Sequence, residues 1–154
     1  METPSPHRIH QESKTDLEAA LRDICRRYDV VAMYAFGSRG EEIAARMRGA
    51  DVPAGTADSD VDIGVLPAPE IDLGASERVD LMQALEDLLG VARVDLVILP
   101  EADPFLAANV VRGERLYAED AYLADEYDLY VLRRAGDLIP LERERIALVL
   151  GESR

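Results

Sequence analysis

The sequence has one cysteine, no tryptophan and no long apolar run. Its single cysteine, Cys25, excludes a disulfide within the chain and is typical of a reducing compartment. No segment approaches the ~20 apolar residues that cross a bilayer, and Met1 to Gln11 lacks the apolar core of a secretory signal. We therefore expect a cytoplasmic protein without a membrane partner.

Basic residues are also scarce, because 31 acidic residues outnumber 17 lysines and arginines and give a net charge of −14. Proteins that bind nucleic acid depend on lysine and arginine contacts to phosphate, so we expect no direct nucleic-acid partner. The charge favours a basic protein partner or a small substrate. With 154 residues the chain is long enough for one domain with a hydrophobic core.

Two apolar segments that are predicted to be strands carry polar residues at one end. Residues 30–36 run directly into Gly37 and Ser38, and residues 61–66 follow Asp60 and contain Asp62. Because side chains alternate along a strand, both carboxylates point to one side, roughly 6.6 Å apart along the chain. Two carboxylates on one face repel each other and lose hydration. A hard divalent cation such as Mg²⁺ relieves both effects.

The residues after the first strand suit a phosphate group. Gly37 allows backbone to come close to a ligand without a side chain between them. Ser38 offers a backbone N–H and a hydroxyl where a helix is expected to begin. Arg39, a basic residue in an acidic chain, is close enough in sequence to reach a triphosphate there.

A third acidic residue, Asp95, lies in the apolar segment 94–99. A lone carboxylate in such a strand is costly unless it is paired, hydrogen-bonded or bound to a metal. The alternative is that Asp95 lies in solvent at the frayed start of the strand.

This ordered set, a strand followed by Gly37-Ser38, then Asp60-x-Asp62, then Asp95 on a later strand, resembles the minimal nucleotidyltransferases of the DNA polymerase β superfamily. Within that superfamily it is most similar to the small prokaryotic antitoxins encoded beside HEPN toxins. The resemblance covers roughly residues 15–118, and residues 112–117 are similar to the family's ending. The segment 39–59 is about twice as long as the family's, and its extra residues are expected in a loop at 49–57. That loop is either a plain surface loop, or it forms a flap over the nucleotide or a contact for the partner.

The resemblance implies an α/β fold, a small mixed β-sheet covered by helices, as in polymerase-β-like nucleotidyltransferases. It implies transfer of AMP from ATP to a tyrosine hydroxyl of a HEPN ribonuclease toxin, which neutralises the toxin. The implied catalytic residues, which would also hold two Mg²⁺ ions, are Asp60, Asp62 and Asp95. The implied nucleotide-binding residues are Gly37, Ser38 and Arg39.

Two other functions stay open at this point. In the first, the protein is a non-catalytic antitoxin whose acidic surface covers a basic toxin. In the second, it is a small-molecule nucleotidyltransferase, for example one that acts on aminoglycosides. That class usually needs a further substrate-binding domain, and the residues after Ala118 leave little room for one.

The domain prediction is a mobile tail at residues 1–14 and a single nucleotidyltransferase domain at 15–154. Helices are predicted at 15–28, 39–48, 76–89, 103–112, 119–134 and 141–150, and a short edge strand at 115–118. Cys25 is expected in the core. The helix at 76–89 is expected to bury Val79, Met82, Leu85 and Leu89, with Leu81 and Leu88 beside this stripe. The C-terminal helices either cover the sheet or bind a partner or a second copy of the chain.

Overall fold

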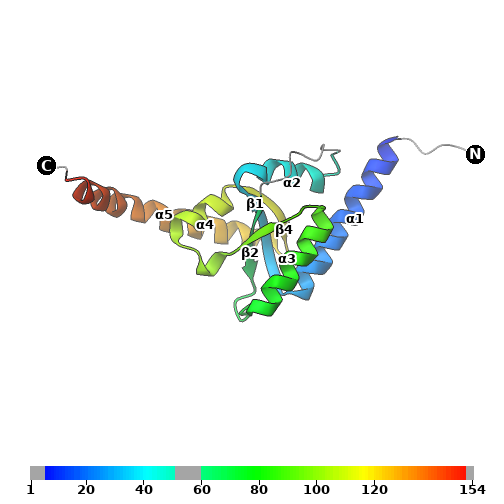
Figure 1. Cartoon of the computed structure of the whole chain (residues 1–154), viewed down its shortest axis with the longest axis horizontal. Helices are drawn as coiled ribbons and strands as arrows, with labels where there is room; N and C mark the ends of the chain where they lie inside the picture. Colours follow the sequence, from blue (N-terminus) through cyan, green and yellow to red (C-terminus); the bar gives the residue numbers. More distant parts are fainter. Residues whose placement is uncertain (1–5, 51–59, 152–154) are drawn as a thin grey trace, which may run out of the picture.

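A four-stranded mixed sheet lies between two layers of helices in the computed structural model, which describes residues 6–50 and 60–151 (Figure 1). The strand order is β3-β2-β1-β4. Central β1 (Val30–Phe36) runs antiparallel to β2 (Val61–Pro67) and to β4 (Glu114–Ala118). The other edge strand, β3 (Val94–Ile98), is parallel to β2. The prediction of an α/β fold with a mixed sheet is confirmed.

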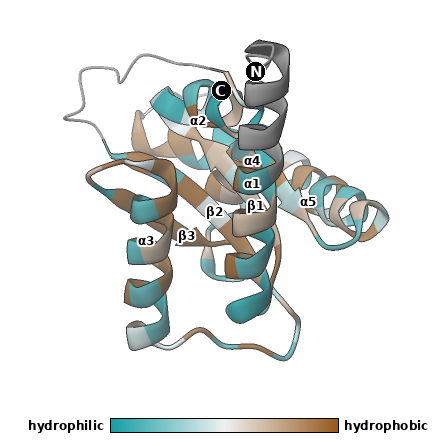
Figure 2. Ribbon diagram, turned by 90° about the vertical axis from the view of Figure 1, so that its right-hand side faces the viewer, coloured by the Kyte–Doolittle hydropathy of each residue, from teal (hydrophilic) through white to brown (hydrophobic). Residues whose placement is uncertain are grey.

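Alternation along the strands gives the sheet a hydrophobic core on each face. On one face, Met33 and Ala35 of β1 pack with α1 (Pro6–Arg27), α2 (Gly40–Met47) and α3 (Ala75–Leu89). On the other face, Ala32 and Tyr34 pack with α4 (Pro104–Val111) and α5 (Ala121–Val149). Figure 2 shows the apolar strands between helices with more polar outer sides. The sheet is therefore a rigid central layer that can hold functional groups at its ends.

Two helix boundaries differ from the predictions. The helix α1 begins at Pro6, so the predicted tail is helical from that residue on. Proline is well tolerated in the first helical turn, where its missing N–H has no partner to lose. The helices predicted at 119–134 and 141–150 are one helix, α5, with Pro140 inside it. Residues around Pro140 are exposed, so water can satisfy the carbonyl that proline leaves without a donor.

The buried side of α3 also differs from the prediction. Leu81, Leu85 and Leu89 are buried, whereas Val79 is 56% exposed. Residues two positions apart point to nearly opposite sides of a helix, so Val79 and Leu81 cannot both face the sheet. The sequence contains two overlapping apolar stripes here, and packing against β3 selects the one that contains Leu81.

The predictions for the cap at Asp103 and for the burial of Cys25 are confirmed. Asp103 caps α4, because its carboxylate accepts hydrogen bonds from the N–H groups of Phe105 and Leu106. Cys25 is fully buried, and burial raises the pKa of its thiol to about 12. Among the helices that the structure describes, none is both long enough and apolar enough to cross a membrane. The loop predicted at 49–57 lies mostly outside the described residues.

Candidate nucleotidyl-transfer site

The predicted carboxylates meet at the end of the sheet where β1 stops and β2 begins. Asp62 of β2 is in register with Phe36 of β1 on one side and with Asp95 of β3 on the other. Neighbouring strands are ~4.8 Å apart, so Asp62 and Asp95 extend from adjacent backbone positions. Asp60 stands two residues before Asp62, just ahead of the strand. The fold thus brings Asp95 beside the pair Asp60 and Asp62, from which it is far apart in sequence.

Burial and the neighbouring carboxylates both raise the pKa of Asp62 above its ordinary value. Partial burial of Asp62 raises its pKa, and the charges of Asp95 and Asp60 raise it further. Asp95 itself is exposed, as the solvent alternative expects, but it lies within β3 and close enough to act on Asp62. Carboxylates that lie this close together are stabilised by a bound cation.

Gly37 brings the backbone directly against Asp62. Its φ angle is +73°, and a Cβ atom at this position would lie 2.3 Å from Oδ2 of Asp62. Any side chain here would therefore collide with the carboxylate and strain the backbone. The 3-10 helix η1 (Gly37–Arg39) starts at this point and leads into α2, with Ser38 exposed to solvent. A helix start presents N–H groups that have no partner within the helix, which suits a phosphate.

Arg39 is buried in an ion pair that the sequence did not predict. It is only 9% exposed, and its guanidinium donates from Nε and Nη2 to the two carboxylate oxygens of Glu42, at 3.0 and 3.1 Å. Arg46 joins the same carboxylate at 3.0 Å and donates to the carbonyl of Leu89. These contacts tie α2 to the end of α3. A nucleotide contact by Arg39 stays a prediction, and it requires Arg39 to share or leave Glu42.

Arg93 is a site residue that sequence reasoning missed. Its Nε lies 3.7 Å from Oδ1 of Asp60, and its carbonyl accepts a hydrogen bond from the N–H of Val61 at 3.0 Å. Arg93 thus supplies a positive charge beside the carboxylate cluster. Its position directly before the strand that carries Asp95 is the sequence signal that would have found it.

A second group of residues that sequence reasoning missed connects the sheet to α5 by polar contacts. The buried hydroxyl of Tyr34 in β1 donates to Asp128 of α5, whose carboxylate also lies 3.5 Å from Arg115 of β4. Arg115 makes a closer ion pair with Asp125, at 2.8 Å. The network ties α5 to the two strands. Asp128 is 94 residues from Tyr34 in sequence, so no local pattern points to it.

The carboxylates suit Mg²⁺, although they do not form a complete metal site. Within residues 6–50 and 60–151, no three acidic, histidine or cysteine side chains form a group that could hold a metal. The assignment of Asp60, Asp62 and Asp95 as metal ligands therefore stays a prediction. Mg²⁺ is commonly held by one or two carboxylates together with substrate phosphates and water. The raised pKa of Asp62 among like charges fits that partial ligand set.

Comparisons with known protein families and solved structures identify the same fold and the same class of protein. The family model described as "Polymerase beta, Nucleotidyltransferase" matches residues 19–122. A solved structure of a tri-AMPylated Shewanella oneidensis HEPN toxin in complex with its MNT antitoxin is similar to this chain, with 25% identity and a TM-score of 0.60. The similarity covers 92% of this chain and 98% of that one.

A variant MntA–HepT toxin–antitoxin complex matches with 26% identity, a TM-score of 0.62 and coverage of 86% and 97%. A toxin–antitoxin complex with AMP-PNP shares the fold, with 24% identity, a TM-score of 0.64 and coverage of 86% and 98%. No curated protein sequence matches the chain. The family match spans Asp60, the strands that carry Asp62 and Asp95, and the turn at Gly37. The chain belongs to the polymerase β nucleotidyltransferase family.

Proposed function

We propose that the protein is an antitoxin that transfers AMP from ATP to a tyrosine hydroxyl of a HEPN ribonuclease toxin. The observation that carries this proposal is the register of Asp62 with Asp95, beside the close approach of Gly37. The similar solved structures support the class of reaction and of partner, since one holds an AMPylated HEPN toxin and another AMP-PNP.

Nucleotide binding would use the end of β1 and the start of β2. Gly37 and Ser38 would hold the phosphates through backbone N–H groups and the serine hydroxyl. Asp60 and Asp62 would hold Mg²⁺, and Asp95 would complete a second ion's site. Bound Mg²⁺ would neutralise charge on the triphosphate and on the oxygens of the reacting phosphoryl group. Arg93 would leave Asp60 once a cation replaces it there.

The transfer step needs a base and an aligned acceptor. The tyrosine oxygen would attack the α-phosphorus, and the bond from that phosphorus to the oxygen that bridges to the β-phosphate would break. Pyrophosphate leaves, and Asp95, which is exposed and thus accessible to an acceptor, would take the hydroxyl proton. Most of the acceleration would come from positioning and charge neutralisation.

The binding antitoxin is the second candidate, and the net charge of −14 favours it as much as the enzyme. An acidic surface attracts a basic partner whether or not transfer follows. The retention of three acids around one point favours the enzyme, because a purely binding protein has no need to hold them against their repulsion.

Intact-mass measurement of the toxin separates the candidates. The purified HEPN partner is incubated with the protein, Mg²⁺ and ATP. We expect the toxin to gain the mass of one or more AMP units with the wild-type protein and none with Asp60→Asn/Asp62→Asn. Glu41→Gln, at an exposed acid of α2, is the matched control and should transfer normally.

Two results would refute the proposal. A toxin that is inhibited stoichiometrically but keeps its mass would establish the binding antitoxin. An unmodified and uninhibited toxin, together with labelling of a small sugar or alcohol, would establish the small-molecule transferase.

A further inference from the structure

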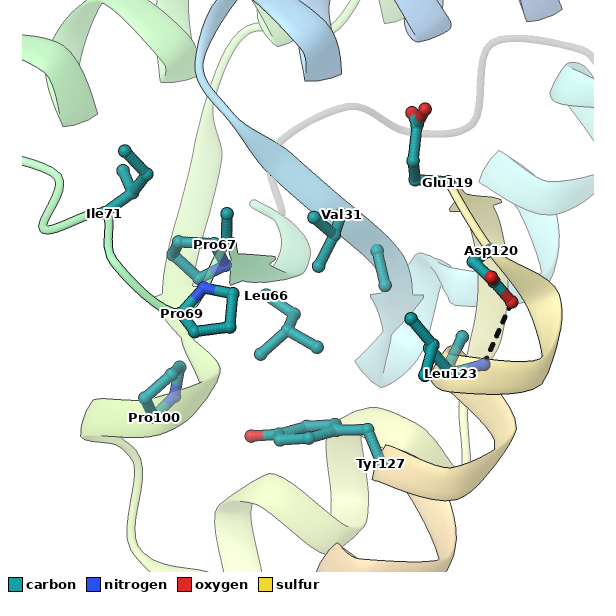
Figure 3. A pocket seen from close by; sticks show the side chains of 13 residues that line it. Val31, Leu66, Pro67, Pro69, Ile71, Pro100, Glu119, Asp120, Leu123 and Tyr127 are labelled. Atoms are coloured by element: carbon teal, nitrogen blue, oxygen red, sulfur yellow. Dashed lines mark hydrogen bonds between the residues drawn. The ribbon is translucent and has the colours of Figure 1, made fainter.

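A cavity of about 580 Å³ lies at the end of β2 (Figure 3). The carboxylates lie at the start of the same strand, so the cavity is at the opposite end of the sheet from them. It is bounded by the end of β2 and the proline-rich turn after it, by η2 (Leu99–Glu101) and by the first turns of α5. Asp62 and Pro67 lie five residues apart on β2, so the cavity is about 16 Å from the carboxylates along the strand. Its volume is within the ~300–1,000 Å³ typical of ligand pockets.

The walls of this pocket are almost entirely apolar. Figure 3 shows Leu66, Pro67 and Pro69 facing Leu123 and Tyr127 across the opening. A register shift in β1 between Val30 and Ala32 accompanies the placement of Val31 in the pocket wall. Prolines lack N–H groups, so this wall offers few hydrogen-bond donors. The pocket thus fits an apolar, and best an aromatic, group.

Carboxylates surround the apolar walls. Glu119 and Asp120 line one rim, and Ile71 on the other rim stands between Glu70 and Asp72 in sequence. Glu119 accepts a hydrogen bond from Tyr117 and lies 3.7 Å from Arg26, and Asp120 caps α5. Asp72 lies 3.9 Å from Arg78, but its side chain is 96% exposed. The rim therefore favours positive charge beside the apolar group.

Occupants from the chain itself fit poorly. The segments 1–5, 51–59 and 152–154 contain no aromatic residue, and the second of them is acidic. A second copy would bring two acidic rims and two charges of −14 together, which costs free energy. A basic partner has neither difficulty, and arginines and aromatic residues are the usual anchors in such pockets.

We propose that this pocket docks a partner protein through an aromatic side chain that lies between arginines or lysines. The partner is then held about 16 Å from the carboxylates along β2, and its reactive hydroxyl stays free to reach Asp95. Tethering at one site raises the effective concentration of the acceptor at the other. The role of the pocket as a docking site for the acceptor rests on the proposed function. Binding of the partner to the pocket does not itself require nucleotidyl transfer.

A synthetic peptide with one tryptophan between two pairs of arginines tests the binding. The chain has six tyrosines but no tryptophan. Excitation at the long-wavelength edge of the tryptophan absorption, where tyrosine does not absorb, therefore reports on the peptide alone. We expect saturable binding with a blue-shifted emission, without ATP or Mg²⁺. Ile71→Ser/Leu123→Ser should weaken it at least tenfold; these side chains are 36% and 58% exposed, so the fold should survive.

Leu129→Ser is the matched control, because Leu129 is 54% exposed on the same helix but does not line the pocket. It should bind the peptide within twofold of wild type. A peptide with glutamates in place of the arginines should not bind.

Four results would overturn the proposal. The first is no saturable binding at millimolar peptide, and the second is binding of the peptide to Ile71→Ser/Leu123→Ser as tightly as to wild type. The third is binding of a neutral naphthalene probe to the same pocket as tightly as the peptide. The fourth is a dimer formed by the chain alone that Leu123→Ser dissociates. In the transfer assay, Leu123→Ser should raise KM for the protein acceptor about tenfold and leave kcat and the KM for ATP unchanged. Peptide binding without any transfer would refute the proposed function and keep the pocket.

Discussion

At the scale of single residues, Gly37 is fixed by two independent constraints. Its φ of +73° disfavours any side chain, and the space that a Cβ would fill is taken by Oδ2 of Asp62. The first constraint shapes the turn into η1, and the second sets how closely that turn approaches the carboxylates. A glycine between a strand and a serine is common in sequences, so only the structure shows this double requirement.

Gly37→Ala should destabilise the protein by about 1–3 kcal/mol, because it adds backbone strain and a collision with Asp62. ATP binding should fall with it. Urea unfolding and calorimetry measure the two effects. Gly136→Ala is the control: Gly136 lies in α5 with open space around it, and alanine there should stabilise by about 0.5–1 kcal/mol. Equal stability of Gly37→Ala and wild type would contradict the close approach.

Asp62 makes the stability of the metal-free protein depend on pH. Its folded pKa is above its ordinary value of 3.8, so the folded state binds the proton more tightly than the unfolded state does. Stability is therefore lost as pH rises from about 3.8 through the raised folded pKa, and the ionised carboxylate remains a cost at neutral pH.

Asp62→Asn should accordingly have a Tm equal to or above that of wild type in EDTA at pH 7, and this advantage should disappear below pH 3.8. With Mg²⁺ and ATP at 100 times Kd, wild type should gain about 2.7 kcal/mol and the variant much less. Thermal unfolding with and without the ligands measures this. A variant that is less stable without ligands and equally stabilised by them would show that Asp62 is not a metal ligand.

At the scale of elements, α5 is attached to the sheet by a polar network as well as by its apolar side. Tyr34, Asp128 and Arg115 connect β1, α5 and β4. Burial first, and then the contact with Asp128, raise the pKa of Tyr34 well above its ordinary range, so its hydroxyl stays a donor. Beyond the network, the last turns of α5 extend away from the body and expose Leu148, Val149 and Leu150 (Figure 1).

Tyr34→Phe should cost about 1–3 kcal/mol, because Asp128 loses its donor in a partly buried place. Tyr117→Phe is the matched control, since it also removes a tyrosine-to-carboxylate hydrogen bond, here an exposed one to Glu119. Its cost should stay below about 0.5 kcal/mol. Chemical denaturation of both variants gives the comparison, and equal costs would mean that the network contributes nothing beyond a surface contact.

The elements show what sequence patterns can and cannot predict. The strands and the carboxylates were predictable, because apolar runs, alternation and the spacing of Asp60 and Asp62 are local signals. The pairs Asp60–Arg93 and Tyr34–Asp128 were not, because they depend on which strands and helices become neighbours. The continuity of α5 through Pro140 was missed because proline usually ends a helix.

At the scale of the whole molecule, the net charge of −14 should govern the encounter with a basic partner. Long-range attraction speeds association, and salt screens it within a Debye length of ~10 Å at 0.1 M. The association rate with the HEPN toxin should therefore fall at least about tenfold from low salt to 0.5 M. The dissociation rate should change little. Stopped-flow mixing measures both, and an association rate independent of salt would contradict steering by charge.

The central claim is nucleotidyl transfer by the carboxylates at the junction of β1, β2 and β3, and the most direct test is the fate of labelled phosphates. The protein, the HEPN toxin and Mg²⁺ are mixed with ATP labelled at either the α- or the γ-phosphate. We predict that the toxin retains the α-label and not the γ-label, that the γ-label leaves in pyrophosphate, and that Asp62→Asn lowers the rate by about 100-fold or more. Retention of the γ-label, or α-labelling at an undiminished rate in Asp62→Asn, would contradict it.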